Sequence, residues 1–160
     1  MTGLAPAELF QRIAIGVLIL VACYTDLTTQ KIKNWLTFPV MAIGAVAAHW
    51  TLGGWWLGAA GVVTAMLACF FPWRMGAIKA GDVKMLMAAG ALLGPLPALR
   101  ATLWMLFLGV PIGIAILAIK GRLGNVKRVV QGEGAPPTVV AHAPVVGLGI
   151  LAAMTWPDLF

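Results

Sequence analysis

The sequence predicts an all-α, polytopic integral membrane bundle of about six transmembrane helices. Hydrophobic residues make up 61% of the 160-residue chain and charged residues only 10%, with a mean hydropathy of +0.97. Soluble domains carry roughly 25% charged residues. The apolar residues fall into six stretches, separated by polar segments or by segments rich in glycine and proline. Because one crossing takes about 20 residues, we expect residues 1–160 to form a single transmembrane domain in the lipid bilayer.

The first three expected helices occupy the N-terminal half. The first runs from about Glu8 to Tyr24, and the long side chain of Arg12 in its first turns can reach the headgroups. No basic region or small-residue cleavage site marks this stretch as a signal peptide. A polar, basic segment follows, and Asn34 is expected to cap the second helix, about Trp35 to Trp50. A tight uncharged turn then leads into the third, about Trp55 to Trp73.

Three more helices are expected in the second half. A basic, glycine-containing loop, Arg74 to Gly81, precedes a short fourth helix of about Asp82 to Leu93, which a glycine–proline segment closes. The fifth helix is about Leu99 to Ile119, and Pro111 is expected to kink it. The sixth, about Val139 to Trp156, follows the longest polar loop of the chain.

Tryptophans and basic residues indicate how the helices lie in the membrane. Six of the seven tryptophans fall at expected helix ends, as an interfacial aromatic belt requires. Nine of the 11 Lys and Arg residues lie in or beside the loops that follow the first, third and fifth helices, and only Arg12 and Arg100 lie opposite. The positive-inside rule then places these three loops in the cytoplasm and both termini outside.

Two carboxylates are the candidate catalytic groups. Asp26 follows the first helix and Asp82 opens the fourth, so both are expected at the cytoplasmic face. When two carboxylates share a site, one stays protonated and can polarise a peptide carbonyl, while the other takes a proton from a water. Taken singly, Asp82 is more simply a helix cap and Asp26 a solvated loop residue. The pair favours peptide hydrolysis, because the chain has only five acids.

Other chemistries lack their residues in this sequence. Cys23 and Cys69 stand alone in apolar stretches, and His49 and His142 are isolated, so no metal site or disulfide framework is indicated. There is no GxSxG motif, and we expect no cofactor. The net charge of +6 does not indicate nucleic-acid binding, since no basic run is interleaved with aromatic residues.

Three segments resemble the type IV prepilin peptidases, membrane aspartic proteases with a GxGD signature. The strongest lies within 75–95, where AGDVKMLMAAGALLGP is closest to the short forms that process Flp-type pilins. The second, DLTTQKIKNWLT at 26–37, is similar to the family's D-x5-I-P-N-x-L-T. The third, VAHAPVVG at 140–147, is similar to the opening of the family's last helix. The chain departs from these patterns at Lys79, in place of the first glycine of GxGD, and at Lys33, in place of the proline.

The resemblance implies an endopeptidase of the bacterial inner membrane, with its active site facing the cytoplasm. It would cut the basic leader from a prepilin or pseudopilin, with Asp26 and Asp82 as the catalytic pair. Gly81, Lys79, Lys84 and Asn34 are expected to support that site. The long members of the family also carry a cysteine-rich loop and methylate the new N-terminus, and this chain has neither those cysteines nor that length.

Two other functions remain open at this point. A non-catalytic relative could bind pilins or help to assemble a secretion machine, and Lys79 favours that alternative. A small transporter could use the two acids as a proton relay. Against the relay, both acids are expected at one face, and no acid is expected at the middle of the membrane.

Overall fold

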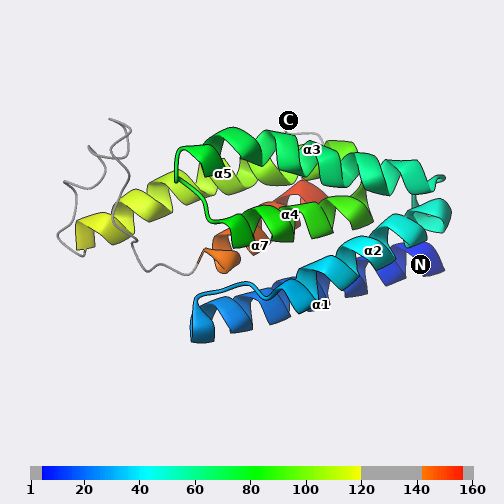
Figure 1. The fold of residues 1–160 in the computed structure, drawn as a ribbon, viewed down its shortest axis with the longest axis horizontal. Helices are drawn as coiled ribbons and strands as arrows, with labels where there is room; N and C mark the ends of the chain where they lie inside the picture. Colours follow the sequence, from blue (N-terminus) through cyan, green and yellow to red (C-terminus); the bar gives the residue numbers. More distant parts are fainter. Residues whose placement is uncertain (1–4, 120–141, 157–160) are drawn as a thin grey trace.

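The computed structural model describes residues 5–119 and 142–156, and all the regular structure in these ranges is helical. The helices are α1 (Pro6–Thr29), α2 (Asn34–Thr51), α3 (Trp55–Arg74), α4 (Ala80–Leu93), α5 (Pro95–Ile119) and α7 (Ala143–Thr155). They run back and forth, so that the α1–α2 and α3–α4 connections lie at one end and the α2–α3 and α4–α5 connections at the other (Figure 1). The all-α bundle is therefore confirmed. The expected loop at 120–138 and the first residues of the sixth expected helix lie outside the described residues.

Three helices, rather than the expected six, are long and apolar enough to cross a membrane. They are α1, α3 and the Pro95–Gly113 part of α5. The other helices of the described chain fall short for physical reasons. With 14 and 13 residues, α4 and α7 are shorter than the ~20 residues of a full crossing. The 18-residue α2 carries polar residues at both of its ends.

The outer surface of the bundle is apolar. Large side chains such as Leu20, Val46 and Phe107 are more than half exposed, which in water would be an aggregation hazard but in lipid is the expected surface. All six tryptophans expected in the interfacial belt are also exposed: Trp35, Trp50, Trp55, Trp56, Trp73 and Trp156. The chain is therefore a helical membrane protein.

Helix α4 is the centre of the bundle. It packs against each of the other five described helices, and from Met85 to Leu92 all of its residues but Met87 are buried. Because protein surrounds this helix, it needs neither the length of a full crossing nor a lipid-facing surface. The carbonyl oxygen of Leu92, near its C-terminal end, accepts a hydrogen bond from the Gln11 side chain of α1 at 2.7 Å. That bond satisfies a carbonyl that the helix itself leaves unpaired.

Small residues let the neighbouring helices approach α4 closely. A Cβ added at Gly61 of α3 would overlap the backbone carbonyl of Gly90, and a Cβ at Gly90 would overlap that of Gly61. A Cβ at Gly44 of α2 would lie 3.0 Å from Ala91. Glycine at these positions is thus required by backbone contact, and it fixes the spacing of α2 and α3 against the central helix.

Helix α1 is longer than the sequence suggested, and this moves Asp26 from a loop into a helix. The expected end at Tyr24 is wrong, because the helix continues to Thr29. The hydroxyls of Thr25, Thr28 and Thr29 bond back to carbonyls one turn earlier, which satisfies these polar groups within the helix. Gln30 then ends the helix in the left-handed conformation, with a φ of 54°.

Candidate active site

The two acids expected to form a catalytic pair line one pocket. Asp26 lies in the last turns of α1 and Asp82 in the first turn of α4, and each is only 2% exposed. The pocket has a volume of about 480 Å³. It lies at the end of the bundle where the α1–α2 and α3–α4 connections meet. Its other lining residues are Gln30, Lys31, Ile32, Lys33, Asn34, Trp35, Lys79 and Gly81.

Asp26 is held by the last helix of the bundle. Its Oδ2 atom accepts a hydrogen bond from the backbone N–H of Ala143, at a distance of 2.9 Å. That N–H belongs to the first residue of α7, so the carboxylate lies at a helix N-terminus, where the helix dipole favours negative charge. The segment at 140–147, which corroborated the resemblance only weakly, therefore contributes a backbone donor to the site.

Asp82 is held within its own helix. Its Oδ2 atom accepts a hydrogen bond from the backbone N–H of Lys79, also at 2.9 Å. The carboxylate thus caps the start of α4, as a capping box does. Asp82 can both cap α4 and line the pocket, because the first turn of α4 lies at the pocket. The side chain of Lys79 is not needed for this bond, since the donor is its backbone.

The backbone at Lys79 does not demand a glycine. Its φ of −87° and ψ of 155° are ordinary extended values that any residue adopts. The departure from GxGD at this position therefore leaves the local chain path and the Asp82 bond intact.

Burial raises the pKa of the Asp82 carboxyl above its ordinary value of 3.8. The hydrogen bond from Lys79 and the charge of His142 oppose that rise, while the nearby charge of Asp26 adds to it. Asp82 lies outside the three helices long enough to cross a membrane. The raised pKa favours a proton on Asp82, and an acid–base pair needs one carboxyl that keeps its proton.

Three of the expected supporting residues connect α2, α4 and the loop between α1 and α2. Asn34 does not cap α2, which was the expectation, because Lys33 occupies the cap position and Asn34 is the first helical residue. Instead, the Asn34 Oδ1 atom accepts a hydrogen bond from Lys84 Nζ at 2.9 Å. The same ammonium lies 5.5 Å from the centroid of the Phe38 ring. Gly81 faces Ile32, to which an added Cβ would approach within 3.3 Å.

Several residues of the pocket were not singled out from the sequence. Gln30 and Lys31, from the connection between α1 and α2, and Trp35, from the first turn of α2, all line it. They lie inside the segment that carried the second resemblance, so their place in the sequence was a usable signal. His142, which was interpreted as an isolated interfacial residue, is the N-cap of α7, and its charge acts on Asp82.

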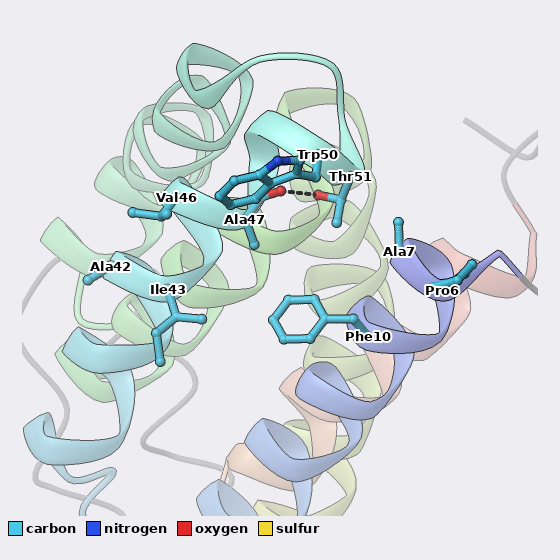
Figure 2. A pocket seen from close by; sticks show the side chains of 9 residues that line it. All are labelled: Pro6, Ala7, Phe10, Ala42, Ile43, Val46, Ala47, Trp50 and Thr51. Carbon is cyan, nitrogen blue, oxygen red and sulfur yellow. Dashed lines mark hydrogen bonds between the residues drawn. The ribbon is translucent and has the colours of Figure 1, made fainter.

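A larger, apolar groove lies between the far ends of α1 and α2. It has a volume of about 770 Å³ and is lined mainly by aliphatic and aromatic side chains, including Phe10, Ile43 and Trp50 (Figure 2). The hydroxyl of Thr51 is directed to the carbonyl of Ala47 at 3.1 Å and not into the groove. None of the lining residues titrates, so the groove offers no acid–base chemistry, despite its size.

The match to known proteins agrees with the geometry. A model of the type IV leader peptidase family matches residues 13–114. The chain belongs to that family. The matched range contains both acids and most of the helices that position them. No curated protein and no solved structure matches the chain. Family membership makes the protein a peptidase of the leader-cleaving kind, located in a membrane.

Among the described residues of this leader peptidase, no group of three or more His, Cys, Asp and Glu side chains is arranged to hold a metal ion. The buried thiol of Cys69 on α3 lies 3.9 Å from the Thr102 hydroxyl on α5. The two acids are on other helices, α1 and α4. The polar groups that line the pocket are carboxyls, lysines, amides and the indole of Trp35.

Proposed function

We propose that the protein is an aspartic endopeptidase that removes the basic leader from a prepilin or pseudopilin by means of Asp26 and Asp82. One observation carries the proposal: the two acids that line the pocket among the described residues come from different helices, are almost fully buried, and are each held by a backbone N–H. Residues 1–160 act as a single domain in this proposal, since the site draws on α1, α4 and α7 together.

The reaction needs a water between the two carboxyls and nothing else from outside. Asp26 is ionised in this mechanism and lies beside the N-terminus of α7. It takes a proton from the water while the water oxygen attacks the peptide carbonyl carbon. Asp82, protonated, donates its proton to the carbonyl oxygen. When the tetrahedral intermediate collapses, Asp26 passes its proton to the leaving amine, the C–N bond breaks, and a hydroxyl of the intermediate returns a proton to Asp82. The pair then again holds one proton between the two carboxyls.

The site faces the cytoplasm of the inner membrane in this proposal. Four basic residues lie in or beside the connections at the end of the bundle that holds the acids: Lys31, Lys33, Arg74 and Lys79. Two others, Arg12 and Arg100, lie toward the opposite end. The positive-inside rule assigns the end richer in lysine and arginine to the cytoplasm. A leader that remains on that side of the membrane can enter the pocket without crossing the bilayer.

The test is leader removal from candidate prepilins of the same genome, co-expressed with the protein and read by mass spectrometry of the membrane fraction. We expect the wild type to remove a leader-sized mass, and Asp26→Asn and Asp82→Asn each to reduce the rate at least ~100-fold, as loss of a general acid or base does. Glu8→Gln is the matched control, because Glu8 is an exposed acid at the other end of α1.

Uncut pilin with the wild type, together with stable pilin binding, would instead support a non-catalytic relative that assembles a pilus or secretion machine. Cleavage that survives both Asp→Asn changes would remove the acid pair from the mechanism.

A further inference from the structure

The rim of the active-site pocket carries three lysines, and two of them are departures from the family motifs. Lys33 replaces the proline of D-x5-I-P-N-x-L-T, and Lys79 replaces the first glycine of GxGD. Both line the same pocket, together with Lys31. Two changes far apart in the sequence therefore meet at one place, beside the proposed catalytic acids.

The lysines and the acids lie at different depths. Lys31 is exposed and Lys33 and Lys79 are half-buried, whereas each aspartate is 2% exposed. The acids therefore form the floor of the pocket and the lysines its rim. Within residues 5–119 and 142–156, no carboxylate pairs with the ammonium of Lys31 or Lys33, so their charges are not neutralised by the described protein. A basic segment would meet repulsion at this rim.

We propose that the rim binds an acidic side chain of the substrate close to the scissile bond, and that Lys33 and Lys79 thereby determine specificity. The inference rests on the proposed function, since it takes the scissile carbonyl to lie on the floor between the acids. Side chains a few positions away on the bound peptide then lie at the rim. A carboxylate there gains the attraction of the lysines, and an ammonium there is rejected. The basic leader consequently extends away from this rim.

An anionic lipid headgroup is the rival occupant, and the lining favours a peptide. A phosphate on the floor would meet two carboxyls, of which at least one is ionised in the proposed mechanism, whereas a bound peptide places a neutral carbonyl there and its carboxylate at the rim. The walls add the amides of Gln30 and Asn34 and the indole of Trp35. Amides both donate and accept hydrogen bonds, which suits an extended peptide backbone.

The experiment measures binding without cleavage. The Asp82→Asn variant is placed in nanodiscs of zwitterionic lipid and titrated with fluorescein-labelled ten-residue peptides. Each peptide carries a single Glu or Gln, moved one position at a time across the cleavage region. We expect one or two positions at which Glu binds about fivefold more tightly than Gln, as for a partly exposed ion pair. The preference should weaken at high salt.

Lysine variants identify the residues responsible. Lys33→Gln and Lys79→Gln should each reduce the Glu preference, while Lys33→Arg and Lys79→Arg should keep it. Lys33→Glu should abolish it or reverse it, so that the Gln peptide binds at least as tightly as the Glu peptide. Arg74→Gln is the matched control, because Arg74 lies at the same end of the bundle but does not line the pocket. That variant should retain the full preference.

The outcomes separate this inference from the proposed function. Equal binding of Glu and Gln peptides at every position overturns the inference, even if leaders are cleaved. A Glu preference carried by Lys33 and Lys79 supports it, even if no leader is cleaved, and then only the proposed function fails. If phosphatidylglycerol in the nanodiscs abolishes peptide binding and the lysine variants restore it, the rim is a lipid site and the inference is also wrong.

Discussion

Each proposed catalytic carboxyl receives one backbone hydrogen bond through a single oxygen. The bonds from Ala143 to Asp26 and from Lys79 to Asp82 both go to Oδ2. The Oδ1 atom of each carboxyl takes no part in these two bonds. That leaves one oxygen of each carboxyl for water and substrate, while the other oxygen fixes the plane of the group. An Asp→Asn change keeps the size of the side chain, so it tests the charge rather than the packing.

The raised pKa of Asp82 predicts the pH dependence of cleavage. Burial makes ionisation of this carboxyl unfavourable, so it keeps its proton above the ordinary 3.8. As the pH rises through the raised pKa, Asp82 loses the proton that it donates to the carbonyl oxygen, and kcat/KM falls. The measurement is kcat/KM on one leader substrate across the pH range. A rate that keeps rising through the alkaline range would contradict the assignment of Asp82 as the acid.

The same titration affects stability with a defined sign. Between the ordinary and the raised pKa, the folded protein holds a proton that the unfolded chain has lost. The free energy of unfolding therefore falls as the pH rises through that window. Thermal unfolding in detergent at successive pH values should show this slope in the wild type and a smaller slope in Asp82→Asn. An equal slope in both would mean that another group causes it.

At the scale of the helices, the site depends on how closely α3 approaches α4. Gly61 and Gly90 touch backbone to backbone, and neither has room for a Cβ. We expect Gly90→Ala to push the helices apart and to destabilise the fold by about 1–3 kcal/mol, as overpacking does. Gly16→Ala on α1 is the control, because a Cβ there meets nothing within 4 Å. The readout is the midpoint of thermal unfolding in detergent, and equal midpoints would show that the contact tolerates a methyl group.

The helices themselves could be predicted from hydrophobic runs, but their ends could not. The run of apolar residues located α3 to within a residue or two, because Trp55 and Trp73 mark its ends. The apolar run did not predict that α1 continues past Tyr24, because the added segment is mostly polar. The hydroxyls of Thr25, Thr28 and Thr29 bond back to the helix there. The apolar run also could not reveal that α4 contacts all five of the other described helices, because those contacts join helices far apart in sequence.

At the scale of the whole molecule, the order of the helices brings the two acids to one end. An up-and-down bundle places the end of its first helix and the start of its fourth on the same side, so this juxtaposition could be predicted from the sequence. The bond from Ala143 to Asp26 could not, because a backbone donor has no sequence signature. The lysine rim was equally hidden, since only the folded structure shows that Lys33 and Lys79 line one pocket.

The orientation of the bundle gives a further prediction. An alkaline phosphatase domain, active only outside the cytoplasm, is fused after Gly53 in the α2–α3 turn or after Arg74 at the end of α3. We expect activity from the first fusion and none from the second, because the lysines gather at the end that holds the acids. The opposite pattern would put the pocket outside the cytoplasm and remove its access to an untranslocated leader.

The hydrogen bond from Ala143 to Asp26 can form only late in the synthesis of residues 1–160. The two partners are 117 positions apart in the chain, and ribosomes add roughly 5–20 residues per second. A nascent chain therefore carries Asp26 in the membrane for on the order of ten seconds before the donor exists. During that interval Asp26 lacks its hydrogen bond from α7, so the proposed catalytic pair takes its final form only after Ala143 has been added.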